Sequence, residues 1–187
     1  MAPPRILIVA GSPIPDAAVC RLAAAFQRDI AFLDAEATLI ALDDYPLPLY
    51  GMTRDDKVPE AAERLRRLAR THAALFVASP SLLGGVPAVL RNLLEWLSEP
   101  LEPRRAAPLF ALAATADDET GAGATLADLE RIIGRGFGAS LIGGGLALGR
   151  AALSFDAKGR LDEPAAAALR ALAREIVLAA ARLAPDP

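Results

Sequence analysis

Three short segments of this chain carry the small and hydroxylated residues typical of ligand-binding loops. They are residues 11–16, 79–86 and 115–124, and each follows an apolar run and precedes a segment with helical spacing. Glycine lets the backbone approach a ligand closely, and the N–H groups at a helix N-terminus bind anions. We therefore expect a ligand site at these loops, and we expect it to open at Gly11 and Ser12.

The elements that must position these loops alternate along the chain. Apolar residues occupy successive positions in five runs, at 6–10, 37–42, 73–78, 108–114 and 141–148. Such runs predict strands that are buried on both faces of a parallel sheet. Helical spacing predicts helices at 16–27, 58–70, 86–97, 125–135 and from 164 onward. The one unusually long connection, 43–57, is of a length that tends to cover a site or a partner surface.

This alternation, with right-handed crossovers, predicts one domain over residues 1–187. The expected fold is α/β and flavodoxin-like: a three-layer αβα sandwich around a five-stranded parallel sheet of order 2-1-3-4-5. In such a sheet, ligands bind outside the carboxyl ends of the strands, at the switch between the first and third strands. The three loops fall at that edge.

Several side chains have expected structural roles. Asp16 is expected to cap the first helix, and Cys20 within that helix is expected to pack as a small hydrophobic residue. Arg66 falls among the charged residues of the second helix, on the face opposite its apolar stripe, and His72 is expected at the surface. One histidine in that position does not assemble a Ser-His-Asp triad.

Composition excludes several classes of function. The formal net charge is −3, arginines are interleaved with acidic residues, and aromatic residues make up only 5%, so we expect no nucleic-acid partner. A single cysteine and a single histidine argue against a zinc centre, and the acidic residues lack the spacing of a metal cluster. No signal peptide and no apolar run of about 18 residues is found. We therefore expect no membrane partner and a cytoplasmic location.

The segment 79–96, reading SPSLLGGVPAVLRNLLEW, resembles the signature of the NADPH-dependent FMN reductase family. In that signature a third strand is followed by P-E-Y-N-G-S-I-P-G and by a helix reading L-K-N-A-L-D-W. The matching residues, with their spacing intact, are Gly84, Pro87, Leu90, Asn92, Leu94 and Trp96. Residues 6–12, 43–50 and 154–161 are similar to the family's first strand with its G-S, to its D-L-P-L-P-x-Y stretch and to its F-D-x-x-G-R-L turn. The resemblance covers nearly the whole chain.

The resemblance implies an oxidoreductase that passes a hydride from NADPH to FMN, and then electrons to a quinone, an azo compound, a metal ion or free flavin. The cofactor carries this chemistry, so no side chain is assigned a catalytic role and no metal is expected. The family also implies a homodimer or homotetramer, with a small-molecule electron acceptor as the other partner. The implied FMN contacts are Gly11, Ser12, Pro80, Ser81, Leu82, Gly84, Gly85 and Thr115.

The first loop departs from the family pattern G-S-x-R-x-x-S-x-N, whose side chains hold the FMN phosphate. Ile14, Ala17 and Val19 stand in place of the Arg, Ser and Asn. The prolines at 13 and 15 lack backbone N–H groups, and the carboxylate of Asp16 would repel a phosphate.

The other two loops also leave alternatives open. In the second loop Leu82 and Leu83 replace Tyr and Asn, and the acidic third loop is either a ligand contact or a solvated cap of the fourth helix. An alternative function is therefore a degenerate flavodoxin-like module that no longer binds FMN tightly and serves binding or assembly. A further alternative is an enzyme that uses flavin as a loosely held substrate.

Overall fold

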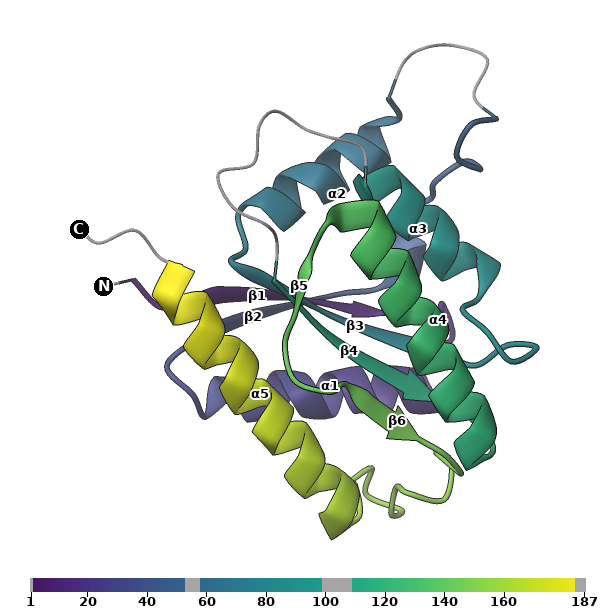
Figure 1. The fold of residues 1–187 in the computed structure, drawn as a ribbon, viewed down its shortest axis with the longest axis vertical. Coiled ribbons are helices and arrows are strands. Elements are labelled where there is room, and N and C mark those ends of the chain that lie inside the picture. Colours follow the sequence, from purple (N-terminus) through teal and green to yellow (C-terminus); the bar gives the residue numbers. More distant parts are fainter. Residues whose placement is uncertain (1, 53–57, 99–108, 184–187) are drawn as a thin grey trace.

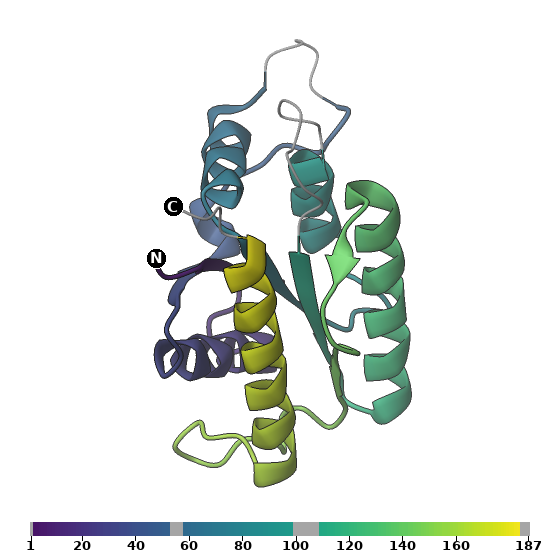
Figure 2. The ribbon, with the colours of Figure 1, turned by 60° about the vertical axis from the view of Figure 1, so that its left-hand side comes forward.

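A parallel sheet forms the middle layer of this protein. The computed structural model describes residues 2–52, 58–98 and 109–183. Strands β1 (Arg5–Ala10), β2 (Glu36–Ile40), β3 (Ala74–Pro80) and β4 (Leu109–Thr115) lie in the order β2-β1-β3-β4, and β5 (Ser140–Leu141) and β6 (Leu146–Leu148) both pair with β4. All these pairings are parallel, and helices cover both faces of the sheet (Figures 1 and 2). The flavodoxin-like prediction is confirmed.

Two apolar clusters hold the three layers together. Helices α1 (Ala18–Ala31) and α5 (Glu163–Leu183) pack on the face that carries Ile6, Ile8 and Phe76. Helices α2 (Glu60–Arg70), α3 (Ala88–Ser98) and α4 (Glu119–Phe137) pack on the other face. Because β1 and β3 are buried from both sides, their successive apolar residues all contribute to the core.

The expected last strand, 141–148, is interrupted. Gly143 and Gly145 adopt φ of +67° and +70°, which breaks the extended backbone between β5 and β6. The N–H of Ile142 still donates to the carbonyl of Phe110 at 2.8 Å. The chain therefore pairs with β4 in two short stretches instead of one.

Two helix starts differ from expectation. Asp16 does not cap α1: the N-cap position is Ala17, and no side chain bonds the first turn. Helix α4 begins at Glu119, earlier than the expected position 125, because Asp118 caps it and accepts a hydrogen bond from the N–H of Gly121 at 2.8 Å. After β2, a short 3-10 turn, η1 (Leu42–Asp44), leads into the long connection.

Arg66 and His72 are buried, contrary to the sequence prediction. Arg66 is 3% exposed, and its Nε donates to the carbonyl of Trp96 at 2.7 Å. His72 is 7% exposed, with Nδ1 2.7 Å from the Leu68 carbonyl and Nε2 2.9 Å from Oγ1 of Thr38. The tertiary partners satisfy these polar groups, and helical periodicity carries no information on such partners.

Within the described ranges, no helix combines the length and the apolar content that crossing a bilayer would require.

His72 makes the stability depend on pH. Burial lowers the pKa of His72, against an opposing effect of its hydrogen bond to Leu68, while the charges of Arg5 and Glu36 act in opposite directions. The unfolded chain therefore binds more protons than the folded one between the lowered pKa of the folded state and the ordinary value of about 6.5. The free energy of unfolding is highest above the unfolded pKa and falls as the pH drops from there through the folded pKa. We expect the urea midpoint to fall between about pH 7.5 and pH 5.5.

The control is His72→Gln, which carries no titrating group at this position. The variant should be less stable at neutral pH because it disturbs a buried network. Its urea midpoint should nevertheless change less with pH than that of the unmodified protein. Equal pH slopes for the two proteins would contradict this role of His72.

Candidate functional site

The carboxyl ends of β1, β3 and β4 bring the three predicted loops together. The N–H of Gly11 donates to the carbonyl of Ala78 at 2.7 Å, which joins the end of β1 to β3. Pro80 pairs with Thr115 across β3 and β4, and the N–H of Ser81 donates to the Thr115 carbonyl at 2.7 Å. The strand order β1-β3-β4 thus places Gly11, Pro80 and Thr115 at one edge of the sheet.

Gly11 is required by close packing. A Cβ at this position would lie 2.6 Å from Cδ2 of Leu90 and 2.8 Å from the carbonyl oxygen of Ala78. Its N–H group is already bonded to that carbonyl. Gly11 therefore allows α3 to pack against the end of β1, and its amide is not free to bind a ligand.

The first loop offers few donors. Oγ of Ser12 accepts the N–H of Ile14 at 3.1 Å, and the N–H of Ala17 donates to the Ile14 carbonyl at 3.1 Å. The two prolines have no N–H to offer. In the first turn of α1, the amides of Ala18 and Val19 donate to no acceptor within the described residues. These two amides are open anion-binding groups at the N-terminus of α1.

Cys20 lies beside this loop but does not extend its chemistry. Its Sγ is 3.5 Å from the carbonyl oxygen of Ser12. Burial, together with the charge of Asp43, raises the pKa of the Cys20 thiol. The thiolate, which is the nucleophilic form, is therefore disfavoured at neutral pH.

The second loop is a tight, exposed turn. The N–H and carbonyl groups of Leu82 and Gly85 bond one another at 3.0 and 3.1 Å. The central residues, Leu83 and Gly84, both have positive φ, +52° and +77°, as a type I′ turn requires. Glycine adopts this conformation freely, whereas it strains leucine. The side chain of Leu83 is fully exposed and that of Leu82 is 62% exposed.

The third loop is short because α4 begins early. Thr115 is 3% exposed, and the N–H of Ala116 donates to the carbonyl of Leu148 at 3.1 Å. Asp118 is occupied as the cap of α4, and the carboxylate of Glu119 is 4.0 Å from Nε of Arg150 in an exposed pair. The capping interpretation of this acidic segment is thus correct for Asp118.

The long connection is tied to α3 by two signature residues. Oδ1 of Asn92 accepts the N–H of Tyr50 at 2.8 Å, and Nδ2 of Asn92 donates to the carbonyl of Pro48 at 3.0 Å. Nε1 of Trp96 donates to the same carbonyl at 2.8 Å. Residues 43–52 of the connection belong to the described structure, and residues 53–57 lie outside it. Asn92 and Trp96 therefore hold a loop.

Asp128 is a site-related residue that sequence reasoning missed. Its Oδ2 accepts the N–H of Val86 at 3.3 Å and an Nη of Arg91 at 3.2 Å, while Arg131 bonds its Oδ1. Partial burial works to raise the pKa of Asp128, but these bonds and the arginine charges hold it below its ordinary value. The spacing of Asp128 and Arg131 is visible in the sequence, but the contact with Val86 is not.

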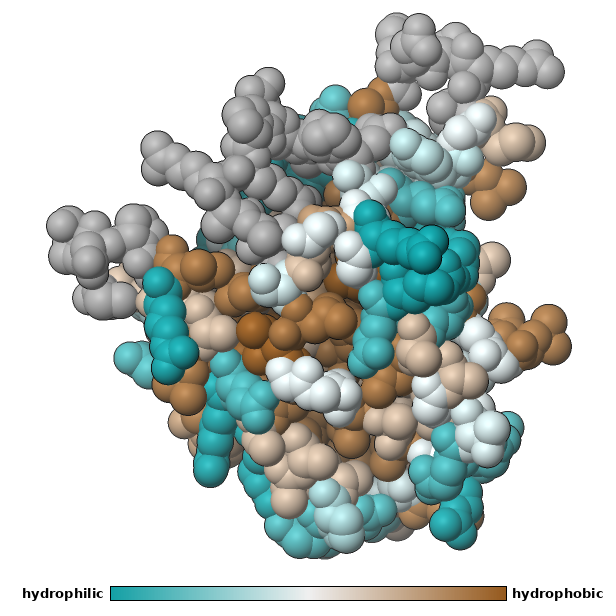
Figure 3. Space-filling view, viewed as in Figure 1, coloured by the Kyte–Doolittle hydropathy of each residue, from teal (hydrophilic) through white to brown (hydrophobic). Residues whose placement is uncertain are grey.

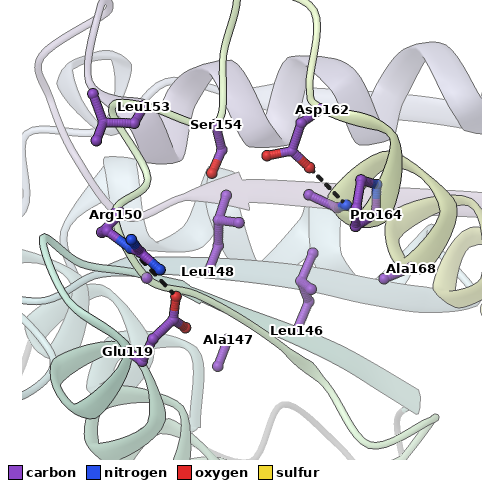
Figure 4. A pocket seen from close by; sticks show the side chains of 12 residues that line it. Glu119, Leu146, Ala147, Leu148, Arg150, Leu153, Ser154, Asp162, Pro164 and Ala168 are labelled. Carbon is purple, nitrogen blue, oxygen red and sulfur yellow. Dashed lines mark hydrogen bonds and ion pairs between the residues drawn. The ribbon is translucent and has the colours of Figure 1, made fainter.

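A hollow of about 540 Å³ lies between β6 and the starts of α4 and α5 (Figure 4). Glu119, Arg150, Ser154 and Asp162 line it together with apolar residues, and Asp162 accepts the N–H of Ala165 at 3.0 Å. Glu119 belongs to the third predicted loop, but none of the implied FMN contacts lines this hollow. On the face shown in Figure 3, apolar side chains gather over the β5–β6 segment between α4 and α5. In the described ranges, no three His, Cys, Asp or Glu side chains are placed to hold a metal ion.

The comparison with protein families decides the assignment. The family model for NADPH-dependent FMN reductase matches residues 4–152, which include all three loops. The chain belongs to the NADPH-dependent FMN reductase family. It is accordingly an oxidoreductase, with FMN as the cofactor and NAD(P)H as the co-substrate of the family. The sequence prediction of family, enzyme class and cofactor is confirmed.

Solved structures share this fold. FerB, a flavoenzyme NAD(P)H:(acceptor) oxidoreductase from Paracoccus denitrificans, is 20% identical with a TM-score of 0.80, over 96% of this chain and 98% of that chain. RosB, solved with bound 8-demethyl-8-formylriboflavin-5′-phosphate, is 16% identical with a TM-score of 0.79, over 96% and 80%. The NAD(P)H:quinone oxidoreductase from Methanothermobacter marburgensis is 14% identical with a TM-score of 0.69, over 94% and 100%.

Gly11→Ala should destabilise the protein by about 1–3 kcal/mol, because its Cβ would overlap Leu90 and a backbone carbonyl. The measurement is the free energy of unfolding in urea. Gly123→Ala is the matched control: it lies in α4, and a Cβ there meets nothing within 4 Å. That variant should gain about 0.5–1 kcal/mol. Equal stability of the two variants would contradict the packing role of Gly11.

Asn92→Ala should cost about 1–2 kcal/mol, because the Tyr50 amide and the Pro48 carbonyl each lose the amide side chain as a partner. Asn92→Asp keeps the acceptor for Tyr50 but sets a carboxylate oxygen against the carbonyl oxygen of Pro48, so it should also be destabilised. Urea unfolding at neutral pH measures both variants. An Ala variant as stable as the unmodified protein would contradict the anchoring role of Asn92.

Proposed function

We propose that this protein uses NAD(P)H to reduce a flat, uncharged organic acceptor of the quinone or azo class, with FMN held at the three loops. The observation that carries this proposal is the exposed apolar character of the loops. Ile14, Leu82 and Leu83 are between 62% and fully exposed, and Leu49 in the segment held by α3 is 62% exposed. Such a rim favours an apolar acceptor over a metal ion.

The second and third loops fit a flavin ring. The turn at Leu82–Gly85 presents backbone with open space around Gly84, since a Cβ there would meet nothing within 4 Å. Thr115, at the end of β4, pairs with Pro80 and lies at the same edge of the sheet. When bound, FMN accepts a hydride from NAD(P)H and delivers electrons to the acceptor. The residues of this chain would hold and orient the ring between the turn and the end of β4.

The first loop offers few groups that could bind the phosphate. The open amides of Ala18 and Val19 lie at the N-terminus of α1, where an anion is favoured. Arg21, the one cation within residues 11–21, has a buried Nε without a hydrogen-bond partner, and its guanidinium lies 4.5 Å from the ring centroid of Phe155. Side chains on helices lean toward the N-terminus. We propose that Arg21 supplies the positive charge that Ile14 does not.

The exposed carboxylate of Asp16 acts against this charge. With two prolines, and with Arg21 as its one cation, the loop holds a phosphate less firmly than the family pattern would. We therefore propose that FMN exchanges with solution during turnover.

Exposed apolar side chains around the loops also support self-association as a homodimer or homotetramer, which light scattering at several concentrations measures directly.

The test is flavin binding followed by activity. Titration of FMN into the purified protein, read by flavin fluorescence, should saturate in the micromolar range, and NADPH oxidation should then depend on an added quinone. Absence of FMN binding at tens of micromolar would contradict the proposal and would favour the degenerate module. Binding without acceptor-dependent NADPH oxidation would contradict the proposed acceptor class.

FMN and riboflavin separate the phosphate contacts from the ring contacts. Asp16→Asn should tighten FMN binding about two- to fivefold, because it removes an exposed negative charge at the helix N-terminus. Arg21→Gln should weaken FMN binding about three- to tenfold, as expected for a lost charge-assisted contact. Neither substitution should change riboflavin binding, since riboflavin lacks the phosphate. Equal effects on both ligands would argue against a phosphate contact.

A further inference from the structure

The carboxylate of Asp128 joins α4 to the stretch 85–91, which is about 40 residues away in the sequence. Asp128 lies on α4, yet its Oδ2 bonds the N–H of Val86 at 3.3 Å and Arg91 of α3 at 3.2 Å. A Cβ at Gly85 would lie 3.4 Å from the same oxygen. The carboxylate therefore lies against the exit of the Leu82–Gly85 turn and at the start of α3.

The other oxygen of Asp128 fixes the orientation of the carboxylate. Oδ1 is bonded by Arg131, three residues later on the same helix. The side chain of Asp128 is 22% exposed, so its charge is only partly screened by water. With both oxygens engaged, the carboxylate is held in the direction that reaches Val86.

The turn needs such an anchor because it has little packing of its own. Leu82 and Leu83 project into solvent, Gly84 has open space around it, and Leu83 adopts a strained positive φ. Besides the reciprocal bonds between Leu82 and Gly85, the turn is fixed at its two ends. At the start of the turn, the N–H of Ser81 donates to the carbonyl of Thr115. At its end, the N–H of Val86 donates to the carboxylate of Asp128.

We infer that Asp128 is a positioning residue, which holds the β3–α3 turn in place for the flavin ring through Val86 and Arg91 without touching the flavin. This inference rests on the proposed function, in which that turn lies against the ring. It assigns to α4 a role in flavin affinity that the three loops alone do not reveal.

The test compares Asp128→Asn with Glu130→Gln. Both substitutions remove one negative charge from α4, but no contact joins Glu130 to the turn within the described structure. Asp128→Asn should raise the Kd for FMN and for riboflavin alike, about three- to tenfold, with kcat at saturating flavin changed less than about twofold. Glu130→Gln should leave both Kd values unchanged. A merely structural defect would instead lower kcat and stability together.

Arg91→Gln provides a second variant if Asp128→Asn folds poorly. Because Arg91 acts through the same carboxylate, its effect on the flavin Kd should be smaller than additive when it is combined with Asp128→Asn. Additive effects of the two substitutions would overturn the shared anchor.

Hydrogen exchange at the amides of residues 82–86 reports on the turn without flavin. It should accelerate in Asp128→Asn and not in Glu130→Gln. Faster exchange with an unchanged flavin Kd would overturn the inference while leaving the proposed function intact. Absence of flavin binding by the unmodified protein would overturn both, and the titration of that protein alone identifies this case.

Discussion

The burial of β1 and β3 on both faces is the constraint on which the rest of the structure depends. Neither face of these strands reaches water, so polar groups that meet a ligand can lie only beyond the strand ends. At the carboxyl edge the backbone of β1 must also pass close to β3 and α3, and only glycine fits at position 11. The same packing that completes the core thus places the three loops side by side.

Helix α3 organises this edge. On one side, Asn92 and Trp96 bond the backbone at Pro48 and Tyr50, and on the other, Arg91 reaches Asp128 of α4. Arg66 of α2 adds a buried bond to the Trp96 carbonyl. The signature residues Asn92 and Trp96, together with Arg91, therefore hold neighbouring segments in place beside the three loops.

Loss of the usual phosphate side chains changes the first loop and leaves the scaffold intact. Asn92 and Trp96 keep their anchoring bonds, while the first loop retains mainly helix amides and one nearby arginine. In the proposed binding mode the flavin ring makes most of the contacts. Changes in the first loop then alter flavin affinity, while the bonds of Asn92 and Trp96 keep the scaffold.

The sequence alone determined the element order, because continuous apolar runs and helical spacing are local signals, and the signature at 79–96 determined the family. It also identified the departures of the first loop at Ile14, Ala17 and Val19. Only the tertiary structure decided the burial of Arg66 and His72, the split of the last strand at Gly143 and Gly145, and the contact of Asp128 with Val86. Those features depend on partners 30 or more residues away or on backbone angles, and residue spacing records neither.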